Sequence, residues 1–346
     1  EIEIISLPSS EPESLPENLE LPLAVSLRKL DIGSVRVLSE AGGKPQFVAT
    51  KVAASLESDG RIHRIPDLHA GLEFGTLAAS GRITGARPFE LDARMGLAGL
   101  AIAADKGLPE ARISAVIAGD PERLNVKAEG ASAGDDGLAG NAEAELLPYS
   151  PLKVASLRLA LTGLDPQAFS PAAPKATLAL QADFRQTDPG RLAGSLMGRN
   201  SASATFDQGG LPVQAMRAQA ILSKESMQLD ELTLVVPGDG EISGTVGWQG
   251  IQKNASADLA VSRIDPSRLD TRLRSASISG SIRLSGDEND QRGVLSLKDR
   301  KLQMDVVFMK VGDMLTLEKM HLRHGRSSLA GSGGLGFGKP QPFHFE

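Results

Sequence analysis

The chain has 346 residues, which is long for a single hydrophobic core, and a compact protein of this length would form about two domains. Its net charge is −6 and no stretch is a basic stripe, which argues against a nucleic-acid partner. It contains no cysteine, so disulfides, thiolate metal sites and a cysteine nucleophile are excluded. Only 3% of residues are aromatic, whereas 37 are glycine and 20 proline, a balance that favours short strands joined by turns.

The two ends of the sequence both have patterns typical of the middle of a strand. The chain begins Glu-Ile-Glu-Ile-Ile and ends Pro-Phe-His-Phe-Glu. No apolar run approaches the roughly 18 residues of a membrane-spanning helix. We therefore expect a central segment of a longer protein, with its targeting signals outside this chain.

The first part of the chain predicts strands separated by glycine-containing turns. Alternating apolar residues predict strand across 21–38, with a break near 31–33, and again across 47–56. The stretches 41–45 and 58–60 predict turns, because glycine accepts the positive φ that tight turns need.

The clearest pattern lies between Arg87 and Leu97, where apolar and polar residues alternate with a period of two. Successive side chains of a strand point to opposite faces, so this period predicts one apolar face and one hydrated face. The same alternation recurs along the rest of the chain. The residues expected to line the apolar face are Phe89, Leu91, Ala93, Met95, Leu97, Leu124, Val126, Leu157, Leu159, Leu161, Leu178, Leu180, Phe184, Leu259, Val261, Ile282, Leu284, Leu302, Met304, Val306 and Phe308.

An internal repeat can be read three times, near 62–97, 227–261 and 313–346. Each copy has spaced leucines, a turn, and then a strand with the pattern apolar-x-Gly-x-apolar. The central glycines are Gly81, Gly244 and Gly331. Such self-similarity predicts hairpins stacked along one axis rather than a globule.

Four Asp-Pro pairs are the best candidate helix starts, because Asp favours the N-cap and Pro the first helical position. They lie at Asp120, Asp165, Asp188 and Asp265, and each has an apolar residue three positions after its proline. We expect single helical turns that close ends or corners of the sheet, although the pair at Asp120 is equally compatible with a hairpin turn.

Three patterns that could carry chemistry are better explained as structure. Residues 331–336 satisfy G-x-G-x-x-G, but the two prolines within 337–342 prevent the helix that a dinucleotide site requires. His321 and His324 would point to opposite faces of a strand, and the five histidines are interpreted as surface residues. The acidic stretch 287–290 lacks the glycine and distal glutamate of an EF-hand loop, so a hairpin tip is expected. We predict no enzymatic activity, no metal and no cofactor.

The same apolar residues could form the closed core of a β-sandwich or barrel, and length separates the alternatives. Roughly 20 to 25 strands about 4.8 Å apart make a sheet on the order of 100 Å long, which this chain cannot cover with a second sheet. We therefore predict an all-β fold with few short helical turns, in which residues 1–346 form one continuous, elongated and curled antiparallel sheet of stacked hairpins. Its U-shaped groove would be apolar inside and would need an apolar ligand.

The chain resembles the TamB family, the inner-membrane subunits of the translocation and assembly module within the AsmA-like superfamily. The resemblance consists of spaced apolar residues, glycines and Pro-Phe pairs, and it runs through nearly the whole chain. The stretches that carry it are 21–37, 161–171, 194–200, 206–213 and 229–248.

What the resemblance implies is a periplasmic protein of a Gram-negative bacterium with a long apolar β-groove. The family has an inner-membrane anchor and a C-terminal domain that meets an outer-membrane barrel partner, and we expect both outside this chain. The groove is thought to conduct phospholipids and is linked to outer-membrane protein assembly. The family has no catalytic residues to carry over.

Three functions follow as hypotheses. The first is a lipid conduit that shields phospholipid acyl chains between the two membranes. The second is a chaperone-like module that assists insertion of outer-membrane β-barrel proteins, with unfolded strands bound by β-augmentation. The third is a structural spacer. Unpaired strand edges near Ile4 and Phe345 also predict end-to-end self-association.

Overall fold

The computed structural model describes residues 2–5, 15–38, 43, 45–73, 75–100, 111–132, 137–170, 172–188, 190–250, 252–337 and 343–345. In this part of the chain the helices are two α-helices of four residues and one 3-10 helix of three, and the other regular elements are strands joined by turns and loops. The predicted all-β class with few helical turns is confirmed. The chain forms two compact units, Glu1–Leu164 with Ala168–Ser170, and Asp165–Gln167 with Pro171–Glu346.

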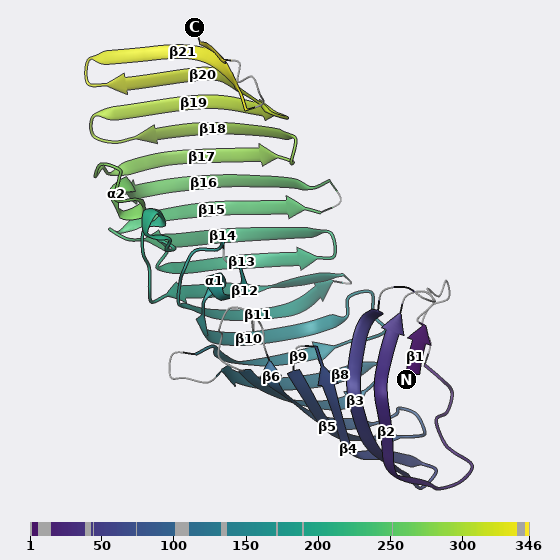
Figure 1. The fold of residues 1–346 in the computed structure, drawn as a ribbon. Coiled ribbons are helices and arrows are strands. Elements are labelled where there is room, and N and C mark those ends of the chain that lie inside the picture. The colour runs from purple at the N-terminus through teal and green to yellow at the C-terminus, as the bar shows by residue number, and fades with distance from the viewer. Residues whose placement is uncertain are drawn as a thin grey trace. The chain divides into compact units, whose positions relative to one another are not determined.

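In the N-terminal unit each strand pairs with the next one along the chain (Figure 1). These pairings are antiparallel, whereas β1 adds to β2 in parallel. The strands are β1 (Ile2–Ile5), β2 (Val25–Leu38), β3 (Pro45–Ser58), β4 (Ile62–Leu72), β5 (Gly75–Thr84), β6 (Leu91–Leu100), β7 (Ala111–Asp120), β8 (Arg123–Ser132), β9 (Ala139–Leu146) and β10 (Val154–Leu164).

The C-terminal unit is an antiparallel meander from β11 to β22. Its strands are β11 (Leu178–Asp188), β12 (Arg191–Asn200), β13 (Ala215–Ser223), β14 (Ser226–Val236), β15 (Gly240–Gln249), β16 (Asn254–Ile264), β17 (Ile278–Gly286), β18 (Asp290–Lys298), β19 (Leu302–Val311), β20 (Met314–His324), β21 (Ser327–Gly336) and β22 (Phe343–Phe345). The helices are α1 (Pro166–Phe169), η2 (Phe206–Gln208) and α2 (Pro266–Leu269).

Two of the four Asp-Pro pairs begin helical turns, and the other two lie at strand ends. Asp265 caps α2 by accepting a hydrogen bond from the Ser267 amide at 3.1 Å. Asp165 accepts from the Gln167 amide at the start of α1, also at 3.1 Å. These two helical turns confirm the prediction. Asp120 instead closes the β7–β8 hairpin by accepting from the amides of 122 and 123, and Asp188 ends β11.

The three predicted repeats share one structural feature, a glycine next to a β-bulge. In each copy the glycine of the middle strand lies beside a β-bulge in the strand before it. The opposed residues at the bulges are Gly81 and Ile65, Gly244 and Leu232, and Gly331 and Met320. A bulge increases local twist, and glycine leaves room where the backbones approach. A Cβ added at Gly244 would lie 2.0 Å from the carbonyl oxygen of Asp258.

One prediction about the opening strand is wrong. The alternation was expected to run unbroken from Arg87, but β6 begins at Leu91. Phe89 has a left-handed φ of 61°, which breaks the extended backbone, and its side chain is 0% exposed. Its amide donates to the Ala86 carbonyl at 2.9 Å, within the turn between β5 and β6. Phe89 therefore belongs to the interior of that turn and cannot line an open surface.

Candidate functional site

The ladder of the N-terminal unit places the predicted apolar residues on one face. Residues directly opposite each other in neighbouring strands share a face. Leu91 of β6 lies opposite Ile83 and Gly119, and Leu97 lies opposite Leu77 and Ile113. The row continues through β8 and β9 to β10, where it includes Leu124, Val126, Ala128, Ala142, Ala144, Leu157, Leu159 and Leu161. We call this surface, from β5 to β10, the N-terminal apolar face.

The other face of the same strands is polar. Asp92 lies opposite Arg82, and Lys127 lies opposite Glu143, which in turn lies opposite Arg158. The Lys127 Nζ atom is 3.1 Å from a Glu143 carboxylate oxygen, and both side chains are well exposed. Because these charged side chains are exposed, the polar face is hydrated, and ion pairs of this kind contribute little stability.

The C-terminal unit repeats this division, and we call the corresponding surface the C-terminal apolar face. Leu259 lies opposite Gly244 and Ile282, while its neighbour Asp258 lies opposite Thr245 and Arg283. The other predicted lining residues of this unit fall into the same rows as Leu259. They are Leu178, Leu180, Phe184, Val261, Leu284, Leu302, Met304, Val306 and Phe308.

The apolar faces are only partly buried. Of the residues predicted to line them, Phe89, Phe184 and Val261 are buried and the rest keep part of their surface accessible. Val261 packs with Val236 and Ile264 in a small cluster, and Leu269 of α2 packs against that cluster. A closed core would bury most of these side chains, so the exposure leaves apolar area for a ligand.

Two hollows mark the N-terminal unit. One, of about 170 Å³, lies over alanines and glycines of β8 and β9 on the apolar face, between Ile113 and the pair Leu159 and Leu161. The larger, of about 1240 Å³, is lined chiefly by polar-face residues, including Arg112 and Glu129. The smaller hollow has an almost wholly apolar lining, which suits a hydrocarbon chain, whereas polar side chains such as Arg112 and Glu129 add to the lining of the larger one.

The strand ends of the C-terminal unit form two different rims. At one end the strands are joined by the segments 201–214, 237–239, 265–277, 299–301 and 325–326. We call these segments, together with the strand ends beside them, the helical rim. It carries η2 and α2, and α2 lies beside the ends of β16 and β17 at the left of Figure 1. Segments such as 224–225, 250–253, 287–289 and 312–313 join strands at the other end, which we call the turn rim.

Asn200 joins the segment before β11 to the loop that follows β12. Its carboxamide oxygen accepts from the amides of Thr177 and Ala202, each at 3.1 Å, and its nitrogen donates to the Leu211 carbonyl at 3.0 Å. The side chain is buried, so all three bonds form away from water. Removing a buried partner of this kind leaves amides unsatisfied, which costs about 1–3 kcal/mol.

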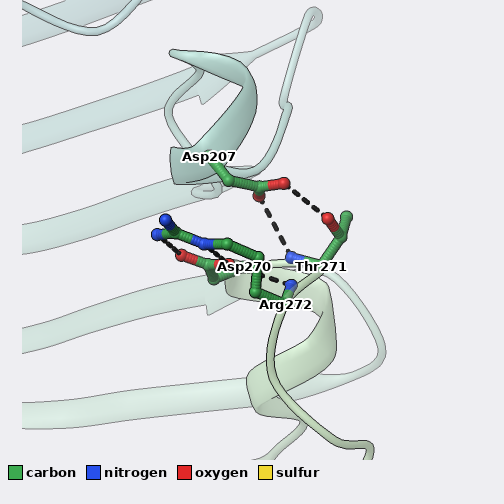
Figure 2. A network of polar contacts seen from close by, with 4 residues as sticks. All are labelled: Asp207, Asp270, Thr271 and Arg272. Atoms are coloured by element: carbon green, nitrogen blue, oxygen red, sulfur yellow. Dashed lines mark hydrogen bonds and ion pairs between the residues drawn. The ribbon is translucent and has the colours of Figure 1, made fainter.

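A second tie joins η2 to the loop after α2 (Figure 2). The Asp207 carboxylate accepts from the Thr271 hydroxyl and from the Thr271 amide, the latter at 3.0 Å. These two bonds lower the pKa of Asp207 to about 2. Beside it, the Arg272 guanidinium donates to both oxygens of Asp270, at 2.9 and 2.6 Å, and lowers the pKa of that carboxyl.

The remaining motifs behave as structure. Residues 327–336 form the strand β21, so the glycine pattern is not a phosphate loop. Asp287 accepts from the amides of Asn289 and Asp290, each at 2.8 Å, and this confirms the hairpin tip. His321 lies opposite Asp305 and His324 opposite Leu302, so the two imidazoles are on opposite faces as predicted. Within the described ranges, no cluster of three metal-ligating side chains forms.

His63 is the exception among the histidines. It lies half-buried opposite Ile83, on the apolar side of β4. One ring nitrogen is 2.8 Å from the Ser58 hydroxyl and the other 2.9 Å from the Leu19 carbonyl oxygen. These contacts hold the segment before β2 against the β3–β4 turn, which is a structural role that the sequence did not indicate.

Comparison with family models, curated proteins and solved structures finds no match to this chain. Among the residues whose structure is described, there is no helix with both the length and the apolar character needed to cross a membrane. The site is therefore characterised by its own geometry: two apolar faces, a hydrated face behind each, and two unlike rims.

Proposed function

We propose that the apolar faces form the inner wall of a groove that carries phospholipid acyl chains. The observation that supports this proposal most directly is the unbroken apolar row on each unit, whose side chains keep accessible area. Contiguous apolar surface of this extent is rarely left facing water, so an apolar ligand accounts for it.

The chemistry of the faces suits a hydrocarbon chain rather than a folded protein partner. Leu, Ile, Val and Ala dominate the rows, whereas protein interfaces are enriched in Tyr, Trp and Arg. An acyl chain needs no hydrogen bonds, and the strands use theirs within the ladders. Lipid headgroups would remain at the rims, where polar residues and water are present.

The resemblance to the TamB family supports the setting of this proposal. We place the groove in the periplasm, tethered to the inner membrane by a segment outside this chain, and conducting phospholipid toward an outer-membrane barrel partner. The role would be transport in support of outer-membrane biogenesis, without an enzymatic step.

Trp248 provides a built-in test. It is the only tryptophan, it lies opposite Met227 and Ala255 on the C-terminal apolar face, and it is 44% exposed. Phospholipids with brominated acyl chains should quench its fluorescence, because bromine quenches indole at close range. Unbrominated lipid of the same headgroup should not.

The matched control moves the tryptophan to the polar face. In the variant Trp248→Phe/Gln249→Trp the indole would stand on the row of Ser226 and Asn254. We expect strong quenching in the natural chain and little in this variant. Equal quenching in both, or none in either, contradicts the proposal. Binding of an unfolded outer-membrane strand in place of lipid would favour the chaperone hypothesis.

A further inference from the structure

The helical rim of the C-terminal unit becomes strongly basic along three successive connections and the strand ends beside them, over residues 265–277, 298–301 and 323–326. Together these segments hold eight Lys and Arg residues and three Asp residues, an excess of five positive charges in a chain whose net charge is −6. We call them the basic rim. Neighbouring connections on one rim are two strands apart, which is about 10 Å.

Most of these cations have no acidic partner. In the described residues, Arg272 is the one whose side chain forms an ion pair and hydrogen bonds, both with Asp270, whereas the other cationic side chains form neither. All the unpaired side chains are exposed. They are Arg268, Arg274, Lys298, Arg300, Lys301, Arg323 and Arg326.

The acidic residues of the basic rim are occupied by local bonds. Asp265 accepts from the hydroxyls of Ser267 and Ser275, each at 2.8 Å, and Asp299 accepts from the Ser277 amide at 3.4 Å. Each of these bonds stays within or between the basic-rim connections. The positive charge is therefore available to an external anion.

The turn rim over the same strands has the opposite balance. Its connections 250–253, 287–289 and 312–313, with the adjoining strand residues Asp290 and Lys310, carry two lysines against four acidic residues. The lysines are Lys253 and Lys310, and the acidic residues are Asp287, Glu288, Asp290 and Asp313. Lys253 is already within 3.6 Å of Glu288. An anion would consequently be drawn to one rim of this sheet and repelled from the other.

Exposed leucines border the basic rim on the apolar side. Leu302 follows Lys301 directly, lies opposite His324, and is 36% exposed. Leu329 lies opposite Leu322 on the next pair of strands and is 56% exposed. A phosphate held by Arg300 or Arg326 would thus have open apolar surface within a few residues of it. This juxtaposition of unpaired cations and exposed leucines fits an amphiphile.

We propose that the basic rim binds the phosphate of an anionic amphiphile, whose hydrocarbon chain lies on the adjoining C-terminal apolar face. The inference rests on the proposed lipid groove and adds the charge of the headgroup and the rim at which it sits. Guanidinium groups suit phosphate because their N–H donors form paired, charge-assisted bonds. A zwitterionic headgroup would gain less, since its own cation would face the same rim.

Calorimetric titration of the whole chain tests the inference with three ligands at matched ionic strength. They are a lysophospholipid with a phosphoglycerol headgroup, one of the same chain with a phosphocholine headgroup, and inorganic phosphate. We expect the anionic lipid to bind at least about tenfold more tightly than the zwitterionic one. Rising salt should erode that difference, because the rim charges are exposed.

Two matched variants locate the effect. The triple variant Arg300→Gln/Lys301→Gln/Arg326→Gln removes three exposed turn charges and should abolish the preference. The control Lys224→Gln/Lys253→Gln/Lys310→Gln removes three charges near the turn rim and should keep it.

The possible outcomes separate failure of the basic-rim inference from failure of the proposed lipid groove. Equal affinity for the two lipids, or a preference that survives in the basic-rim variant, overturns the inference but leaves the lipid groove standing if brominated chains still quench Trp248. Binding of inorganic phosphate as tight as that of the anionic lipid would make the rim an inorganic-anion site and also overturn it. Failure of both lipids to bind and to quench Trp248 removes the proposed function itself.

Discussion

The apolar face and the polar face of each unit are formed by the same strands, yet they offer a charged side chain different environments. Leu259 and Asp258 are neighbours in sequence and lie in separate rows, one apolar through Gly244 and Ile282, the other polar through Thr245 and Arg283. On the polar face a charge finds water and a partner 3.2 Å away. On the apolar face a charged side chain would have neither water nor an oppositely charged partner. Strand register therefore determines which side chains lie on the apolar face, where they can contact a ligand.

Charge placed on the two faces should produce the largest difference. Leu259→Asp puts an unpaired carboxylate among partly buried aliphatic side chains and should lower the free energy of unfolding by about 2–4 kcal/mol. Asp258→Asn removes an exposed ion pair with Arg283 and should change it by less than about 1 kcal/mol. Chemical denaturation of both variants measures the contrast. Similar losses would mean that the two faces are not distinct in environment.

Substitution of the bulge glycines tests whether the backbone of the apolar face requires glycine at these positions. Gly244 has a φ of 149° and its Cβ position lies 2.0 Å from the Asp258 carbonyl oxygen, so Gly244→Ala should cost about 1–3 kcal/mol. Gly334 in β21 has nothing closer than 3.8 Å to the corresponding position, so Gly334→Ala should stay within about 1 kcal/mol. Thermal unfolding separates the two. A neutral Gly244→Ala would show that the bulge tolerates a side chain.

The sequence predicted the faces well because a period of two is a local property. Alternation placed residues such as Leu124, Leu159 and Met304 in the correct rows without knowledge of the fold. It failed at Phe89, where one left-handed residue ends the extended backbone before β6. The prediction that one groove continues through the whole chain stays a prediction.

The rims were harder to foresee because their contacts are distant in sequence. Asp207 and Thr271 are separated by four strands and a helical turn, and no local pattern links them. The parallel pairing of β1 with the second half of β2 was missed for the same reason. The basic rim left a visible signal, the density of Lys and Arg in 298–301 and 323–326, but only the ladder shows that these turns share a rim.

The smallest effect is expected at the Asp207 tie, which is exposed and joins two loops rather than a face. Asp207→Ala should speed hydrogen exchange of the Thr271 amide, because that amide loses its acceptor. The pKa of Asp207 is lowered to about 2 in the folded chain, so its contribution to stability is complete above about pH 4 and disappears as pH falls through 2. The stability difference between the natural chain and the variant should follow that course. A difference unchanged down to pH 2 would contradict the assigned bonds.

Site-specific photo-crosslinking along β6 tests the central claim most directly. A photoreactive residue is placed singly at Leu91, Ala93, Met95, Asp92 and Arg94 of the whole chain, which is then irradiated in the presence of phospholipid. The account predicts lipid adducts at Leu91, Ala93 and Met95, which share the apolar row, and none at Asp92 and Arg94, which share the polar row. Equal labelling at odd and even positions, or labelling only at the even ones, would contradict it.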